Sequence, residues 1–358
     1  MQYRSRFPLI ASSLFLFLLA IWAGLVRLGW RLPPLLPTLP LAHGPLMVSG
    51  FLGTLIALER AVALRARWTY IGPLLTSLGG LFLALGIGGE IGKVLIVLGS
   101  LSLLLVFAVI VRRHFALYTV VMAVGALAWL VGNLFWLFGW PIYHIVLWWA
   151  GFLVLTIAGE RLELGRLTRL SRPVEAAFLS AVALFLVGLL VTIPAYDFGS
   201  RLAGVGMIAL GAWLLRYDLA RHTVRKPGLP RYIAICLLAG YVWLLAAGLV
   251  GFVYGGTAAG PRYDALLHAI FLGFVISMIF GHAPIIFPAI LGVQVTFHPV
   301  LYAHLILLHG SLLLRSSADL AGAVTFRLWG GLLNGIALLL FLGSMAFVVT
   351  SGRRTEDR

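Results

Sequence analysis

The histidines are the residues of this sequence whose type and spacing suggest chemistry. His43 begins H-G-P-L-M-V-S-G-F, His144 begins H-I-V-L-W-W-A-G-F, and His268 begins H-A-I-F-L-G-F. All three open apolar runs, where an ionisable side chain is costly and points to function by default. A neutral imidazole can bind haem iron, copper or zinc without carrying charge into lipid. These positions therefore predict a haem or metal site.

The three histidines occupy matching places in an internal repeat. In the first two copies the histidine is followed, after six residues, by Gly-Phe and, after seven more, by Glu-Arg. In the third copy Gly273-Phe274 is two residues nearer the histidine, and His282 stands where the other copies carry glutamate. A repeat of this kind predicts related structural blocks. We expect one transmembrane domain, residues 1–358, with internal blocks at approximately 1–113, 114–222 and 223–358.

Further histidines in the apolar runs extend the list of candidate ligands. His304 and His309 share a predicted helix that reaches the same half of the membrane as the leading histidines. His282 lies 14 residues after His268, about 21 Å further along a helix, and so in the inner half. The candidate cofactor and metal ligands are His43, His268, His144, His309 and His304, with His282 as a further metal candidate. Two alternatives remain open: His298 as a helix cap, and His282 as a partner of carbonyls freed by Pro284.

Composition identifies lipid as the solvent of the fold. Apolar residues make up 62% of the 358 residues and charged residues only 10%, and the mean hydropathy is +1.07. No soluble fold buries that much apolar side chain. The net charge of +15 does not indicate nucleic acid, because lysine and arginine gather in short loops. A single cysteine excludes an intramolecular disulfide and a cysteine-ligated cluster.

Apolar runs of about 20 residues predict an all-α polytopic protein of about twelve membrane-spanning helices. The runs lie near residues 8–30, 43–64, 70–89, 93–111, 116–138, 142–160, 174–193, 201–219, 232–254, 264–290, 297–315 and 322–350. With this segmentation nineteen of the 26 basic residues fall on one side, which the positive-inside rule assigns to the cytoplasm. We therefore predict a multi-pass protein of a prokaryotic cytoplasmic membrane with both termini cytoplasmic.

Other features allow two interpretations. Glu59-Arg60 and Glu160-Arg161 predict ion pairs at helix ends, with proton transfer as the alternative. The glycines of the repeat allow either close helix packing or the approach of a flat macrocycle. Acidic residues are few and stand near helix ends, which argues against a carboxylate relay at the membrane centre. The tryptophans of the middle block are expected in an outer aromatic belt; they are Trp129, Trp136, Trp140, Trp148 and Trp149.

The motifs resemble those of known haem proteins. Three blocks of four helices, with His-Gly and Met47 opening the second helix, resemble subunit I of the haem–copper oxidase superfamily. The motifs are more similar to those of the NnrS family of haem- and copper-containing membrane proteins linked to nitric oxide metabolism. This sequence has P-L-A-H-G-P-L-M-V-S-G-F where the family has W-H-x-H-E-M-L-F-G-F. It has I-A-G-E-R-L-E where the family has I-G-G-R-V-I-P. His268-Ala269 through Gly281-His282 resembles H-A-x-x-x-G ending in G-H-T-G-R.

This resemblance implies a haem–copper oxidase-like arrangement and one or more b-type haems. It places His43 and His268 as an axial pair and His144, with His309 or His304, at a second haem or a copper site. The implied partners are membrane lipid, a small diatomic gas and an electron donor such as a quinol or cytochrome. The implied function is nitric oxide redox chemistry or detoxification, which leaves open an oxidoreductase activity. The alternatives are a small-solute or metal transporter and a haem or copper assembly factor.

Overall fold

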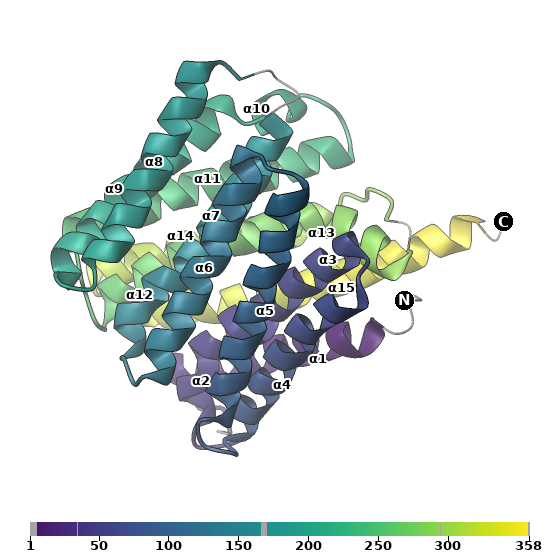
Figure 1. Ribbon diagram of the computed structural model, residues 1–358. Helices are drawn as coiled ribbons and strands as arrows, with labels where there is room; N and C mark the ends of the chain where they lie inside the picture. The colour runs from purple at the N-terminus through teal and green to yellow at the C-terminus, as the bar shows by residue number, and fades with distance from the viewer. Residues whose placement is uncertain (1–5, 34, 166–169, 294, 357–358) are drawn as a thin grey trace. The chain divides into compact units, whose positions relative to one another are not determined.

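The protein is helical throughout the part that the structure describes. The computed structural model describes residues 6–33, 35–165, 170–293 and 295–356 (Figure 1). Helix accounts for 84% of the structure, and these residues contain no strand. Each of the twelve predicted apolar runs coincides with a helix or with a series of helical segments that follow one another without a break. The all-α class is thus confirmed.

Two compact units make up the chain. Unit 1 comprises Met1–Phe152 with Ala289–Gly292, and unit 2 comprises Leu153–Pro288 with Val293–Arg358. The boundary falls inside the helix α7, Ile142–Gly165, and not at the predicted block boundaries. Compact units and sequence repeats are different divisions of a chain, so the three blocks stay a prediction. Each unit is described below by itself.

Unit 1 is built around the first predicted copy of the repeat. Its segments are α1 Phe7–Leu28, α2 Leu39–Pro45, the π-helix η2 Leu46–Gly53, α3 Thr54–Leu64, the short 3₁₀-helix η3 Arg67–Tyr70, α4 Ile71–Leu85, α5 Ile91–Arg113, α6 Leu117–Leu137 and the start of α7. Helices α4 and α5 lie side by side (Figure 1). A Cβ on Gly80 would stand 3.1 Å from the Gly50 Cα, so glycine lets η2 and α4 pack closely.

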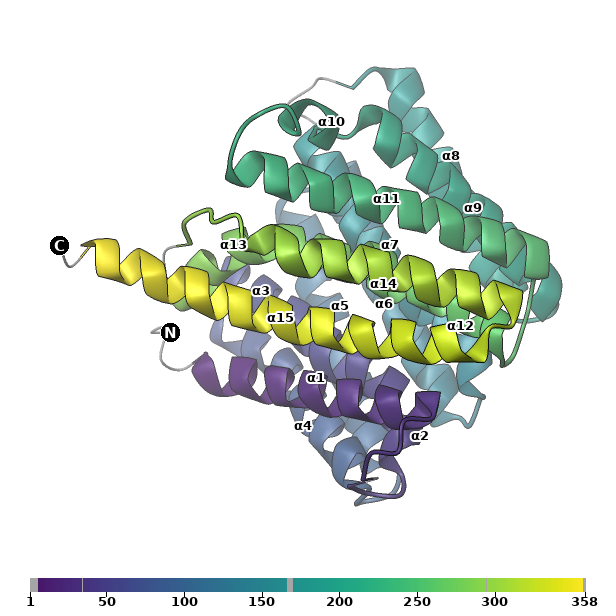
Figure 2. The same cartoon turned by 180° about the vertical axis from the view of Figure 1, so that it is seen from behind.

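Unit 2 contains the third copy. Its segments are the rest of α7, α8 Arg172–Val191, α9 Tyr196–Tyr217, α10 Ala220–Thr223, α11 Leu229–Tyr254, α12 Pro261–His268, the π-helix η5 Ala269–Ile276, α13 Ser277–Leu291 up to Pro288, α14 Leu301–Ala321 and α15 Val324–Glu356. Helices α14 and α15 run side by side (Figure 2). A Cβ on Gly204 would stand 2.7 Å from the Gly248 carbonyl oxygen, and this close contact joins α9 to α11.

Eleven helical spans of the described residues are long and apolar enough to cross a membrane. This composition is compatible with a polytopic membrane protein. The one predicted span missing from that set is 297–315, which corresponds to α14, a helix of 21 residues. Its apolar character is reduced by the buried residues His304, Arg315 and Asp319. These residues belong to the polar contacts described in the next subsection.

The two π-helices follow the leading histidines of the first and third copies. Segment η2 begins three residues after His43, and η5 begins directly after His268. Each has eight residues, and in each the Gly-Phe pair occupies the fifth and sixth positions. π-Helices are rare overall, and those that occur are often found at functional sites. In the second copy, α7 carries Gly151-Phe152 as a regular α-helix.

The predicted aromatic belt is wrong for two of its tryptophans. Trp129 and Trp149 are fully buried. Trp129 stacks on Phe152 with ring centroids 4.6 Å apart, and its indole N–H donates to the Ser49 hydroxyl at 3.2 Å. The Trp149 indole donates to the Asn133 side-chain oxygen at 2.9 Å. A buried indole needs such an acceptor, and these rings therefore belong to the core of unit 1.

Candidate functional site

His43 lies in α2 and reaches toward α1. Its Nδ1 is 2.7 Å from the Ala20 backbone oxygen. A carbonyl only accepts, so Nδ1 carries the proton and Nε2 carries the lone pair of the neutral ring. Gly24 makes this geometry possible, because a Cβ there would lie 2.7 Å from the His43 Cε1 atom. The ring is therefore held against the backbone of α1 in one tautomer.

His268 is the last residue of α12, and its Nδ1 faces two oxygens of one residue. The Asp264 backbone oxygen lies 2.9 Å away, and the carboxylate Oδ1 lies 3.3 Å away. Both are acceptors, so Nδ1 is again the protonated nitrogen of the neutral ring. His43 and His268 thus share one tautomer, which is fixed by a backbone carbonyl in each case.

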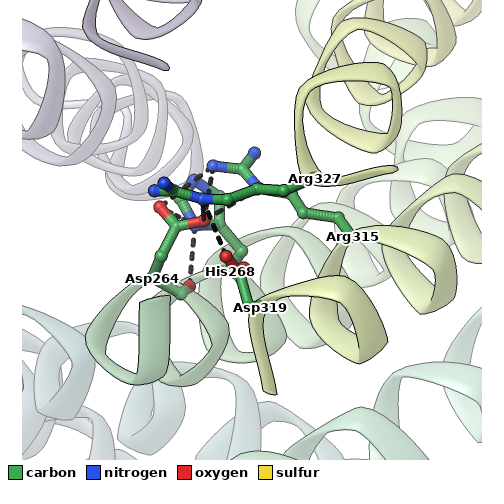
Figure 3. A network of polar contacts seen from close by, with 5 residues as sticks. All are labelled: Asp264, His268, Arg315, Asp319 and Arg327. Carbon is green, nitrogen blue, oxygen red and sulfur yellow. Dashed lines mark hydrogen bonds and ion pairs between the residues drawn. The ribbon is translucent and has the colours of Figure 1, made fainter. Parts of the chain in front are cut away.

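His268 belongs to a cluster of charged side chains from three helices (Figure 3). Arg315 of α14 donates to Asp264 through Nε at 2.9 Å and through Nη2 at 3.0 Å. Arg327 of α15 pairs with the Asp319 Oδ1 at 2.7 Å and lies 3.9 Å from the Asp264 Oδ2. The Asp319 side chain is fully buried. The cluster thus pairs two acidic side chains with two guanidinium groups, as burial of charge requires.

The composition of the cluster follows from spacing within two helices. Asp264 and His268 are four residues apart in α12, and Arg315 and Asp319 are four apart in α14. Residues at this spacing lie on one face of a helix. Sequence reasoning missed this site, although R-Y-D-A-L-L-H and R-S-S-A-D carry the signal. What it could not supply is that α12, α14 and α15 bring these faces together.

His144 stands at the start of α7, in unit 1, in an aromatic setting. Its ring makes an edge contact with Trp140, with centroids 5.7 Å apart, and lies 4.6 Å from the ring of Tyr143. No π-helix follows it within α7. The position at a helix entrance agrees with the prediction, whereas the surroundings differ from those of His43 and His268.

His309 and His304 both hydrogen-bond through their two ring nitrogens. The Trp243 indole donates to His309 Nδ1 at 2.9 Å, so Nε2 carries the proton, and it lies 3.3 Å from the Ser277 hydroxyl. His304 Nδ1 lies 2.8 Å from the Ser344 hydroxyl, which itself donates to the Leu340 carbonyl. The Tyr232 hydroxyl completes the set at 2.9 Å from His304 Nε2.

His282 is held in the same way. Its Nδ1 lies 2.6 Å from the Met278 carbonyl oxygen, and Arg161 donates to Nε2 at 2.9 Å. The positive charge of Arg161 also acts on Asp218, whose carboxyl is buried. Burial raises the pKa of Asp218, and the charge of Arg161 opposes that rise. His298 accepts from the Val300 backbone N–H at 3.1 Å, in the turn before α14, whose N-cap residue is Val300 and not His298.

The fit of these residues to a haem or metal differs between positions. His43 and His268 have the geometry expected of an axial ligand, because a metal-binding histidine usually donates its other N–H to a carbonyl or carboxylate. His304, His309 and His282 hydrogen-bond through both ring nitrogens. Among the residues that the structure describes, no three histidine, cysteine or acidic side chains are grouped so as to hold a metal ion.

The glycines of the repeat favour packing over approach of a macrocycle at three positions. A Cβ on Gly53 would lie 2.3 Å from the Trp129 ring, and one on Gly273 would lie 2.4 Å from the Trp243 ring. Gly50 faces Leu16 and Gly80. Gly44 differs, because a Cβ there meets nothing within 4 Å.

Fold and site together define a chain that is helical over the described residues, compatible with a polytopic membrane protein, and that carries partly buried histidines and a charged cluster. The chain belongs to the family described as a domain of unknown function, DUF8744, which matches residues 6–350. A search of curated proteins found no match.

Proposed function

We propose that the protein is a haem-binding, multi-pass protein of a prokaryotic cytoplasmic membrane, with its termini in the cytoplasm. His43 and His268 are each proposed as an axial ligand of b-type haem. The observation that carries this proposal is their common setting. His268 directly precedes a π-helix, and His43 lies three residues before one. Each donates Nδ1–H to a backbone carbonyl. This arrangement orients Nε2 as the ligand atom.

The chain contributes orientation and charge to this function. Ala20 and Asp264 hold the two rings in the required tautomer, and Asp264 links His268 to the charged cluster. A bound haem would supply a redox-active iron able to coordinate a diatomic gas. Nitric oxide handling, with a quinol or cytochrome as electron donor, is the finer proposal. It rests on the motif resemblance, as do the twelve-helix oxidase-like arrangement and a copper site at His144.

The decisive measurement is an optical difference spectrum of the detergent-purified protein, reduced with dithionite and compared with the oxidised form. Iron and copper are determined on the same sample. We expect sharp bands of a low-spin b-type haem, absent from the double variant His43→Ala, His268→Ala. His222→Ala is the control, because His222 is exposed. If ample haem is supplied and the protein is colourless and free of iron and copper, the proposal is wrong.

A small-solute or metal transporter is the second candidate, and the cluster around Asp264 favours it. Buried charged groups in membrane helices mark transport pathways as well as cofactor sites. A haem or copper assembly factor would bind the same cofactor but release it. Haem that remains stoichiometric and does not exchange with added apomyoglobin would argue against the assembly factor.

A further inference from the structure

We propose that the charged cluster of Figure 3 sets the donor strength of His268, with Asp264 strengthening the ring as a ligand and Arg315 moderating it. This inference rests on the proposed function, since it assigns His268 to a metal centre. Asp264 acts through His268 and is therefore a positioning residue rather than a ligand. Nothing in the motif resemblance points to this carboxylate.

The first step is the position of the carboxylate relative to the ring. Oδ1 of Asp264 lies 3.3 Å from His268 Nδ1, beside the backbone oxygen at 2.9 Å. An N–H that faces a negatively charged oxygen makes the opposite nitrogen of the ring more basic. Nε2 of His268 is therefore a stronger donor than it would be if Nδ1 faced the backbone carbonyl without the carboxylate.

The second step is that the carboxylate cannot turn away. Both of its oxygens are bonded to Arg315, by Nε at 2.9 Å and Nη2 at 3.0 Å. This two-point pairing fixes the plane of the carboxylate. The side chains of Asp264 and Arg315 are only 16% and 9% exposed. Water screens such charges less than surface charges.

The third step is the order of charges around the ring. Asp264 is the carboxylate in contact with His268, and Arg315 is bonded to the carboxylate itself. Arg327 pairs with Asp319 and also lies 3.9 Å from the Asp264 Oδ2. The negative charge of Asp264 therefore faces the His268 ring, and the positive charge of Arg315 offsets it from the far side of the pair. Neutralising Asp264 and neutralising Arg315 should change the ring in opposite directions.

The chemical consequence concerns the two oxidation states of the metal. A more basic imidazole stabilises the more highly charged state, so it favours ferric over ferrous iron. Changes in groups behind a metal ligand alter affinity about 10- to 100-fold. We expect Asp264→Asn to shift the ratio of ferric to ferrous affinity about tenfold toward ferrous.

The experiment is an equilibrium redox titration of the haem-loaded protein and its variants, followed by optical spectroscopy. Asp264→Asn should raise the midpoint potential, and Arg315→Gln should lower it. Asp197→Asn is the matched control, because Asp197 and Arg201 form a 2.8 Å ion pair that is exposed. Shifts of the same sign in both cluster variants, or shifts no larger than that of the control, would overturn the inference.

A measurement on the haem-free protein keeps the inference testable by a second route. In protein labelled with ¹⁵N-histidine, the Nδ1 proton of His268 is assigned from its loss in His268→Gln. A strongly deshielded proton that moves upfield in Asp264→Asn supports the carboxylate contact; an unmoved resonance contradicts it. If the protein binds no haem, the proposed function is wrong, but the shift of the His268 Nδ1 proton in Asp264→Asn can still be measured. If haem is bound but its midpoint potential is the same in Asp264→Asn, in Arg315→Gln and in the parent, this inference is wrong and the proposed function is not affected.

Discussion

The segments that follow His43 and His268 share a backbone form but differ in the charge around the histidine. Both contain an eight-residue π-helix with Gly-Phe at its fifth and sixth positions. His43 is held by the carbonyl of a neighbouring helix, whereas His268 is held by a residue of its own helix that belongs to a charged cluster. His144 lacks the π-helix. The repeat thus keeps the Gly-Phe segment and varies what surrounds the histidine.

The same comparison explains the irregular spacing of the third copy. His268 is two residues nearer Gly-Phe than His43 is, yet the π-helices keep one register relative to Gly-Phe. Two residues correspond to a rotation of about 200° around a helix. The two rings therefore leave their helices in different directions relative to the shared segment. One finds its carbonyl on α1, and the other finds it in α12.

The largest expected effect separates these two histidines from His144. His43→Ala and His268→Ala should each lower the amount of bound haem. Even changes behind a ligand cost about 10- to 100-fold in metal affinity, and removal of the ligand should cost more. His144→Ala should keep the low-spin bands. Haem content per protein, from pyridine haemochrome spectra, measures this. Equal losses in all three variants would remove the distinction between the copies.

The next prediction concerns the way that His43 alone is held. Gly24→Ala places a Cβ 2.7 Å from the His43 Cε1 atom and 2.9 Å from its Nδ1, so the ring must move away from the Ala20 carbonyl. We expect haem affinity to fall about tenfold, the lower end for a change behind a ligand. Haem titration of the apoprotein gives the affinity. Gly44→Ala, which meets nothing within 4 Å, is the control and should bind as the parent does.

The two π-helices should respond alike to the loss of a glycine. Gly53→Ala forces a Cβ against Trp129, and Gly273→Ala forces one against Trp243, at 2.3 and 2.4 Å. Overpacking of this kind costs about 1–3 kcal/mol. Thermal unfolding in detergent, followed by tryptophan fluorescence, should show lower midpoints for both variants. Gly44→Ala should unfold as the parent does, and a midpoint lowered equally there would rule out the packing explanation.

The sequence predicts the helices well because apolar length alone defines a membrane helix. It does not predict the π-helices, since the same apolar run suits either backbone hydrogen-bond pattern. The cluster around Asp264 depends on three helices meeting, which no local pattern contains. Similarly, His304 and His309 are sound ligand candidates by residue type. Only the packed structure shows that Tyr232 and Trp243 hydrogen-bond to them.

The smallest expected effect is on the pH dependence of stability. It concerns the charged groups near His282, the other histidine of the third copy. Arg161 joins His282 by a 2.9 Å hydrogen bond and acts on Asp218, a residue between two spanning helices. Burial raises the pKa of Asp218 above the ordinary 3.8. The folded state then holds the proton to higher pH than the unfolded state does, so stability falls as pH rises through the interval between the two pKa values.

Asp218→Asn has no carboxyl to titrate and should lose that part of the pH dependence. Thermal midpoints measured in detergent from about pH 4 upward, starting near the ordinary carboxyl pKa, should decline less steeply in the variant than in the parent. Glu175→Gln, at an exposed position, controls for the loss of one negative charge. Parallel curves for parent and Asp218→Asn would mean that the Asp218 proton does not differ between the folded and unfolded states. The charge contrast between the first and third copies would then rest on His268 alone.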